Sequence, residues 1–290
     1  MSLNKFVVRQ KRKRTGAAGS KSGTETAGKF LKRETETWST KQRETETETR
    51  STAQHFSKLK AGSAKDPTTL DKVDSPLTWH KIRAQNLDLD YVRLYKRSEA
   101  DDILRALEET VTYNTGQQAQ VLMFGKWVDI PRKQSAYGEP GLSYTFSGNT
   151  VPARPWIPSL TCIRDRISAL SGFDFNFVLV NRYKDGCDYM GEHKDDEKDL
   201  ADGHPIASLS LGQPRDFYFK HQDSRGKKAT RKMDTVKLVL EHGGLLLMNP
   251  PTNRFWYHAL PKRTRLSDVR INLTFRKMNP AMCKPVKKGI

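Results

Sequence analysis

His193 and Asp195 are an imidazole and a carboxylate two positions apart, and they have the types and spacing to hold a metal ion. Both lie in the segment Asn181–Glu197. On an extended chain, side chains at positions i and i+2 point to the same side, so both could reach one ion. A third candidate ligand is His258, in the β-rich run Phe255–Leu260. Two imidazoles and one carboxylate on a β scaffold form the facial triad of non-haem iron(II) oxygenases, which leaves coordination positions open.

The segment Arg270–Arg276 carries a second chemical signal. Strand alternation places Arg270, Asn272, Thr274 and Arg276 on one face, opposite three apolar residues. Two guanidinium groups on one face could bind a dicarboxylate through bidentate bonds. A hydrolytic zinc site also uses two imidazoles and one acid, but it needs no dicarboxylate clamp beside it. The arginine pair therefore favours an iron(II) oxygenase.

The order of these motifs resembles the AlkB family of iron(II)- and 2-oxoglutarate-dependent dioxygenases, and within it a branch that demethylates double-stranded DNA. The resemblance covers roughly Trp79 to Lys277. The strings that carry it are Phe124–Trp127, Pro131–Gln134, Tyr144–Gly148, Phe175–Asp188, Asp223–Lys227 and Arg270–Lys277. The resemblance implies oxidative repair of N-alkylated bases. The lesions are 1-methyladenine and 3-methylcytosine, whose demethylation releases formaldehyde and succinate, and etheno adducts.

The resemblance also implies roles for individual residues. His193, Asp195 and His258 would bind Fe(II), and O2 would be the second cosubstrate beside 2-oxoglutarate. In the 2-oxoglutarate pocket, Arg276 would meet the carboxylate distal from the metal and Arg270 the other end. The remaining residues implied for this pocket are Asn181, Tyr183 and Thr274.

A base in a duplex reaches an enclosed site only by flipping out of the stack, and the hole it leaves suits an apolar wedge. The resemblance gives the wedge role to Phe124 at the tip Phe124-Gly125-Lys126. It places Tyr144, Thr145, Phe146 and Ser147 in the base pocket, with Asp196 and Glu197 beside the metal strand. Strand aromatics are more often core residues, and this alternative fits Phe146 better than Phe124.

Contacts with the DNA backbone require cations and exposed backbone groups. The candidates are Arg132, Lys133, Lys220, Gly226, Lys227, Arg263 and Arg265. Thr264 departs from the family pattern, which has a cation at this position.

The composition agrees with a polyanionic partner. The chain has 290 residues and a hydrophobic content of 36%. Its formal net charge of +18 favours nucleic acid over a membrane as the partner. Three scattered cysteines without a C-x-x-C motif indicate a reducing compartment and no zinc cluster. We expect a monomer with no membrane partner.

Residues 1–76 show little apolar periodicity, and we expect a disordered basic tail. Lys11–Arg14 is a basic cluster typical of nuclear import, which predicts a nuclear location. Lys5-Phe6-Val7-Val8-Arg9 resembles the short motif that tethers repair proteins to the replication sliding clamp, at replication foci. We expect a second basic tail at residues 281–290.

The elements that position these residues can be placed from periodicity. A helix is predicted from an N-cap at Ser98, with Ile103 and Leu107 on its buried face, and another over Trp156–Ser171. We expect a buried strand over Phe173–Tyr183, with Phe173, Phe175 and Phe177 on one face. Further strands are expected at Ile206–Leu211, Asp216–His221, Thr235–Leu240, Leu245–Met248, Arg254–Leu260 and Val269–Lys277.

Periodicity alone indicates a β-rich α+β domain, an antiparallel sandwich or barrel. The family resemblance implies a double-stranded β-helix, or jelly roll, with supporting helices and a β-hairpin nucleotide-recognition lid. The domain would span residues 77–280, with the lid at about 113–155 and the core at about 173–278. Two alternative functions remain open. One is an RNA or protein demethylase of the same superfamily, and the other is a catalytically silent DNA-binding adaptor on the sliding clamp. The intact triad and arginine pair argue against the adaptor.

Overall fold

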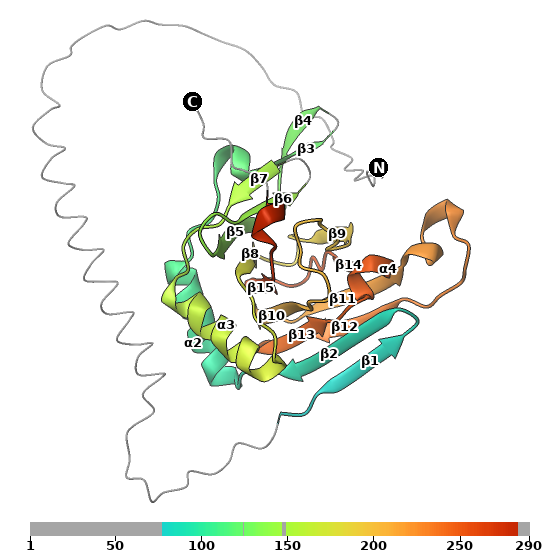
Figure 1. Cartoon of the computed structure of the whole chain (residues 1–290), viewed down its shortest axis with the longest axis horizontal. Helices are drawn as coiled ribbons and strands as arrows, with labels where there is room; N and C mark the ends of the chain where they lie inside the picture. The colour runs from blue at the N-terminus through green and yellow to red at the C-terminus, as the bar shows by residue number, and fades with distance from the viewer. Residues whose placement is uncertain (1–76, 124, 147–148, 284–290) are drawn as a thin grey trace, which may run out of the picture. The chain divides into compact units, whose positions relative to one another are not determined.

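The computed structural model describes residues 77–123, 125–146 and 149–283 (Figure 1). Two antiparallel sheets form its framework. The large sheet has the strand order β1 (His80–Ala84), β2 (Leu87–Arg93), β13 (Gly244–Met248), β10 (Ile206–Gly212), β15 (Arg270–Arg276), β8 (Phe177–Tyr183) and β5 (Lys133–Gly138). The small sheet has the order β12 (Val236–Leu240), β11 (Arg215–His221), β14 (Trp256–Leu260) and β9 (Met190–His193). This architecture agrees with the predicted jelly roll.

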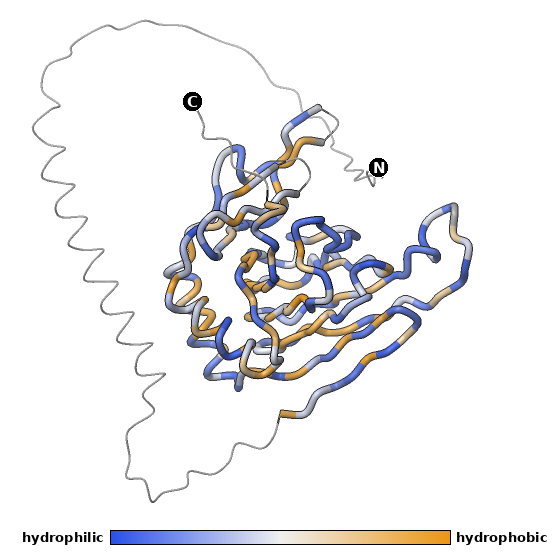
Figure 2. Tube along the Cα trace, viewed as in Figure 1, coloured by the Kyte–Doolittle hydropathy of each residue, from blue (hydrophilic) through white to orange (hydrophobic). Residues whose placement is uncertain are grey.

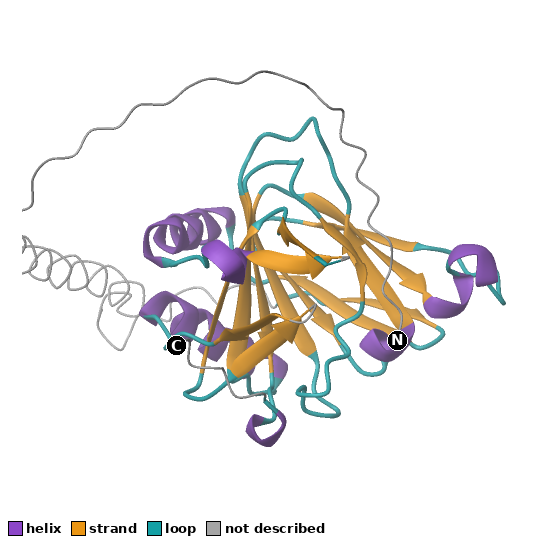
Figure 3. Ribbon diagram, turned by 90° about the horizontal axis from the view of Figure 1, so that it is seen from above, coloured by secondary structure: helices purple, strands orange, loops and turns teal. Residues whose placement is uncertain are grey.

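One face of the large sheet packs against helices α2 (Arg97–Thr110) and α3 (Pro158–Ser171), which Figures 1 and 3 show together on one side of the strands. The core between them includes the apolar residues of β15, Ile103 and Leu107 of α2, and Leu160 and Ile163 of α3. Figure 2 shows hydrophobic residues recurring along these strands and helices. The predicted alternation on β15 is confirmed, since Ile271, Leu273 and Phe275 all lie in this core. The opposite face of β15 is therefore turned toward the small sheet.

The N-cap of helix α2 lies two residues before the predicted N-cap at Ser98. Its N-cap is Lys96, whose backbone N–H donates to the Glu99 carboxylate at 2.9 Å. A carboxylate at the third helical position can accept from the backbone N–H of the N-cap residue. Glu99 therefore determines where α2 begins. Helix α3 begins at Pro158 rather than Trp156, because proline suits the first turn of a helix.

The prediction that Phe173, Phe175 and Phe177 share one strand face is wrong. Strand β8 begins only at Phe177, and Phe173 is exposed before it. Phe175 packs in the helix-side core, with its ring centroid 6.3 Å from that of Phe275, whereas Phe177 packs in the cluster on the opposite face. Strand alternation is valid only within the hydrogen-bonded strand, and Phe173 and Phe175 precede it.

Two hairpins precede and follow β5. The first pairs β3 (Gln120–Met123) with β4 (Lys126–Asp129), and Gly125 at its turn has φ +76°. The second pairs β6 (Ser143–Phe146) with β7 (Asn149–Pro152). The hairpin predicted from Gly125 is present, and Phe124 at its tip lies outside the described residues. Among the described helices, including α4 (Thr252–Phe255), none is long and apolar enough to span a membrane.

Gly186, after the end of β8, fixes how closely two loops approach. A Cβ atom at this position would lie 1.8 Å from the carbonyl oxygen of Arg263, and the two backbones are joined by the bond from Arg263 N to Gly186 O at 2.7 Å. We expect Gly186→Ala to force the loops apart and to lower the free energy of unfolding by about 1–3 kcal/mol. Denaturant unfolding would measure this, with the exposed Val239→Ala as the control that stays within about 0.5 kcal/mol of the wild type. Equal stability of Gly186→Ala and the control would contradict the close approach.

Candidate metal centre and cosubstrate pocket

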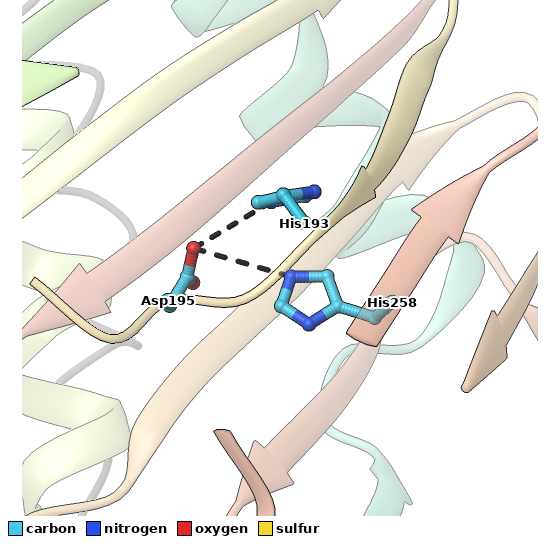
Figure 4. Close-up of side chains that lie close together, drawn as sticks. All are labelled: His193, Asp195 and His258. Atoms are coloured by element: carbon cyan, nitrogen blue, oxygen red, sulfur yellow. Dashed lines mark ion pairs between the residues drawn. The ribbon is translucent and has the colours of Figure 1, made fainter. Parts of the chain in front are cut away.

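The three predicted metal ligands converge from adjacent strands of the small sheet (Figure 4). His193 ends β9 and lies opposite His258 on β14, and Asp195 follows two residues later. Asp195 Oδ1 is 3.5 Å from His193 Nε2 and 4.0 Å from His258 Nε2. One ligand atom from each residue lies within 4.8 Å of the others. The three residues could therefore hold one iron ion.

The protonation states suit metal binding. Gly191 O lies 2.9 Å from His193 Nδ1, so with Nδ1 as the donor Nε2 keeps its lone pair for a metal. Burial lowers the pKa of His193, and it lowers the pKa of His258 to about 3. Both imidazoles are thus neutral near pH 7, the form that binds metals.

Asp195 supplies the negative charge of the centre. Burial alone would raise its pKa, but the Arg276 guanidinium and the two imidazoles lower the pKa well below its ordinary value. Its Oδ1 is buried and has no hydrogen-bond partner among the described residues. Two neutral nitrogens, one carboxylate and no thiolate fit Fe(II) better than structural zinc.

Arg276 lies at the metal end of the pocket. Its Nη2 donates to Asp195 Oδ2 at 3.0 Å, and its guanidinium lies over the Tyr144 ring, 5.0 Å from the centroid. This contact with a metal ligand argues against the prediction that Arg276 meets the carboxylate distal from the metal. At about 3.3 Å per strand residue, the Cα atoms of Arg270 and Arg276 lie roughly 20 Å apart. Arg270 is thus the arginine remote from the metal.

Arg270 is a buried cation that forms no ion pair with a carboxylate among the described residues. Its Nη2 donates to Ser210 Oγ at 2.8 Å, and Nη1 approaches Leu240 O at 3.5 Å. Nε has no partner in the described part of the chain. Burial lowers its pKa to about 10, although nearby Tyr183 opposes this shift. A buried cation is costly unless an anion compensates it, so this position suits a ligand carboxylate.

The side chains between the two arginines line the inner face of the large sheet. Asn181 Oδ1 accepts from Arg132 Nε at 2.9 Å and from Gln134 Nε2 at 2.8 Å. Tyr183 lies opposite Arg270 in the β8–β15 register, and burial raises the pKa of its phenol, which keeps it a donor. Thr274 Oγ1 donates to Asn272 Oδ1 at 3.0 Å.

Arg132 was predicted to contact the DNA backbone, but its hydrogen bonds in the structure are made within the pocket. Its side chain is half-buried, donates to Asn181 and approaches the Tyr189 carbonyl at 3.4 Å. It belongs to the pocket wall because Asn181 holds it there. The adjacent Lys133 is exposed and lies 5.9 Å from the Tyr113 ring centroid.

Sequence reasoning also missed two polar residues of this wall on the neighbouring strand β10. Ser208 accepts from Asn272, and Ser210 accepts from Arg270. The signal was present in Ile206–Leu211, where serines alternate with leucines in a strand that is otherwise apolar.

Of the predicted base-pocket residues, Tyr144 and Glu197 lie together. Tyr144 is buried, and its hydroxyl donates to Glu197 Oε1 at 2.7 Å. Burial and nearby Asp195 raise the pKa of Glu197 to about 7. Asp196 is more exposed and pairs with Lys194 Nζ at 3.0 Å, yet it lines a cavity of about 550 Å³ together with Asp195, Glu197 and Arg276.

The structure describes only some of the remaining base-pocket and lid candidates. Thr145 Oγ1 is 3.0 Å from Thr150 Oγ1 across the β6–β7 hairpin. Lys126 is exposed beside the Gly125 turn. The Phe146 side chain, Ser147 and the clamp-binding motif Lys5–Arg9 lie outside what the structure describes.

Of the other predicted backbone contacts, one lies on strand β11 and the rest lie on two loops beside the small sheet. Lys220 is half-buried near the end of β11, and Gly226 and Lys227 are exposed in the connection to β12. Arg265 is exposed, and Arg263 is exposed but forms an ion pair with Asp216. Thr264 is exposed between them.

Comparison with known proteins agrees with this site. The 2OG-Fe(II) oxygenase superfamily matches residues 23–276, and the chain belongs to this superfamily. It is therefore an oxidoreductase that uses Fe(II), 2-oxoglutarate and O2.

Among its relatives are two mammalian proteins named DNA oxidative demethylase ALKBH2. The Mus musculus protein is 56% identical over 202 residues, which are 70% of this chain and 84% of that protein. The Homo sapiens protein is 56% identical over 201 residues, or 69% and 77% of the two chains. The Rattus norvegicus alpha-ketoglutarate-dependent dioxygenase alkB homolog 3 is 38% identical over 152 residues, or 52% and 51% of the two chains.

Removal of one imidazole tests the metal centre. We expect His258→Ala to weaken Fe(II) binding by at least about 100-fold, because a ligand is lost from a set of three. Titration with Fe(II) under anaerobic conditions would measure this, and thermal unfolding would show that the fold survives. The exposed His80→Ala is the matched control with wild-type affinity. Wild-type iron affinity in His258→Ala would exclude His258 as a ligand.

Proposed function

We propose that this chain is a DNA oxidative demethylase that removes N-alkyl groups from bases in double-stranded DNA. The observation that carries the proposal is the 56% identity to proteins named DNA oxidative demethylase over about 70% of the chain. The lesions we propose are 1-methyladenine, 3-methylcytosine and etheno adducts. An RNA or protein substrate is the alternative that the experiments below distinguish.

The proposed division of labour assigns each end of the pocket to one arginine. His193, Asp195 and His258 would hold the iron. Arg276 keeps Asp195 ionised and oriented, and Arg270 would bind the distal carboxylate of 2-oxoglutarate with the help of Tyr183. Bound iron and 2-oxoglutarate supply the oxidation of an N-methyl carbon by O2, coupled to decarboxylation to succinate. The protein orients and shields these groups.

Glu197 and Tyr144 are proposed to face the substrate base. Their hydrogen bond, at 2.7 Å, lies beside Arg276 and the metal ligand Asp195. An N-alkylated base such as 1-methyladenine is cationic, so carboxylates beside the metal favour it over an unmodified base. Asp196 adds negative charge at the margin of the same cavity.

The proposal of a duplex substrate is supported by the β3–β4 hairpin. Leu122, Trp127 and Val128 on this hairpin are 47%, 48% and 43% exposed. Apolar side chains exposed around a hairpin tip suit insertion into stacked bases. We propose Phe124 as the wedge at this tip, with Lys220, Gly226, Lys227, Arg263 and Arg265 along the backbone.

We further propose a nuclear monomer that meets the sliding clamp through Lys5–Arg9. The motivation is the sequence alone, namely this motif and the basic cluster Lys11–Arg14 in the N-terminal 76 residues. The proposed division into a basic tail and a dioxygenase domain from residue 77 to about 280 has the same basis.

The two ends of the cosubstrate can be told apart with pyruvate, a 2-oxo acid without the distal carboxylate. We expect Arg270→Ala to weaken 2-oxoglutarate binding by about 10- to 150-fold, because a charge-assisted bond of about 1.5–3 kcal/mol is lost. Pyruvate affinity should change little. Calorimetric titration of the metal-loaded protein would measure both, with Arg276→Ala as the comparison. A selective loss in Arg276→Ala instead would restore the opposite assignment.

The wedge proposal predicts a difference between double- and single-stranded substrates. We expect Phe124→Ala to reduce methyl removal from a duplex at least about tenfold more than removal from the same strand alone, because only the duplex must be unstacked, at a cost of a few kcal/mol. Formaldehyde release from both substrates would measure this, with the exposed Phe173→Ala as the control. Equal losses on both substrates would reject the wedge, and wild-type release from RNA alone would reject the DNA substrate.

A further inference from the structure

We infer that Glu192 and Tyr257 position the segment Gln222–Lys228 by holding Arg225, so that Lys227 is fixed for contact with a substrate phosphate. This inference rests on the proposed DNA substrate and assigns a role to residues outside the metal centre. The segment belongs to the connection between β11 and β12, the orange part that projects to the right in Figure 1.

Arg225 is held from two directions. Its Nε donates to Glu192 Oε2 at 2.8 Å, and its guanidinium carbon lies 3.5 Å from the centroid of the Tyr257 ring. Glu192 is itself fixed, because its Oε1 accepts from the Tyr218 hydroxyl at 3.2 Å. A planar guanidinium that stacks on an aromatic ring and pairs with a carboxylate has one defined orientation.

The residues that hold Arg225 come from three neighbouring strands of the small sheet. Glu192 is on β9, Tyr257 on β14 and Tyr218 on β11. Alternation along β9 turns Glu192 to the outer face, whereas the next residue, His193, faces the metal centre. One strand therefore carries a metal ligand on one face and the attachment point of the segment on the other.

Arg225 is a positioning residue rather than a phosphate contact. Its side chain is only 17% exposed, and its partner carboxylate would repel a phosphate. The next two residues, Gly226 and Lys227, are exposed instead. Gly226 has φ +64°, which allows the chain to turn away from the sheet directly after the anchor.

The residues just after the segment are bonded back to Asp223 near its beginning. The N–H groups of Thr230 and Arg231 both donate to Asp223 O, at 2.9 and 3.2 Å. Arg225 and these backbone hydrogen bonds together hold the segment before DNA binds, so the segment loses less conformational entropy on binding. The attachment thereby increases the affinity that Lys227 provides.

Removal of the Glu192 carboxylate separates positioning from simple charge. Glu192→Ala raises the net charge by one, which by itself would tighten binding to DNA. We expect the opposite, a loss of about three- to tenfold in affinity for a methylated duplex. The slope of log K against log salt should also become less negative by about 0.9. Lys227→Ala should show the same loss and slope. The double variant with Glu192→Ala and Lys227→Ala should lose no more affinity than either single variant, because both substitutions remove the same phosphate contact.

Two further variants complete the test. Glu241→Ala removes a carboxylate that pairs with Arg93 elsewhere, and it should bind the duplex at least as tightly as the wild type. Arg225→Lys keeps the charge and leaves β9 unchanged, so it should reproduce the loss even if Glu192→Ala disturbs the neighbouring metal ligand. Fluorescence anisotropy over a salt series would measure all of these affinities.

Two results would overturn the inference. Glu192→Ala and Arg225→Lys could bind as tightly as the wild type, or their losses could add to that of Lys227→Ala. Hydrogen exchange without DNA gives an independent readout, because both variants should accelerate exchange in residues 222–231. If the wild type itself fails to bind the duplex, the proposed function fails, and the exchange result then decides whether Arg225 holds the segment.

Discussion

The ion pair between Arg276 and Asp195 is the interaction on which the site depends. Both side chains are almost completely buried, and their contact of 3.0 Å joins the end of a strand in the large sheet to the segment that follows β9 in the small sheet. Burial of a lone carboxylate would favour its protonated form. The guanidinium opposes this and leaves Asp195 Oδ1 available to a cation. The same guanidinium lies over the Tyr144 ring, so one cation contacts both the candidate metal centre and the proposed base pocket.

The two-sheet framework explains how one site can hold several polar groups in an interior. On β15 every second residue faces the helices and is apolar, whereas the alternate residues face the space between the sheets. There Thr274 donates to Asn272, while Arg270 donates to Ser210 and Arg276 to Asp195. Arg215 performs a similar task at the edge, where it donates to the carbonyls of Asp185, Asp188 and Pro261. Arg215 thus bonds two loops to strand β11 of the small sheet.

The sequence was sufficient for features that depend on local pattern. Alternation on Arg270–Arg276 and the spacing of His193 and Asp195 could be read directly, and the strands of the jelly roll lay near the predicted ranges. Features that depend on distant neighbours could not be read in this way. Arg132 resembles a surface cation in sequence, and only the position of Asn181 on the adjacent strand shows that it faces the pocket. Which of the two arginines lies beside the candidate metal centre depends on Asp195, which is distant in sequence. The N-terminus of α2 was misplaced because a carboxylate at Glu99 caps it from within.

The small sheet assigns different tasks to its two faces. Its inner face carries His193 and His258, and its outer face carries Glu192, Tyr218 and Tyr257 around Arg225. Because His193 and Glu192 are adjacent, the distance between the metal and the outer loop is set within one rigid strand. A base that flips toward the metal and a backbone that lies on the loop would therefore be held in a fixed relation.

The most direct test of this account is the stoichiometry of products from a duplex that carries 1-methyladenine. The wild-type protein, supplied with Fe(II), 2-oxoglutarate and O2, should release one formaldehyde for each succinate formed in the presence of this substrate. Succinate without formaldehyde, or formaldehyde from RNA but not from the duplex, would contradict the claim that this iron site demethylates double-stranded DNA.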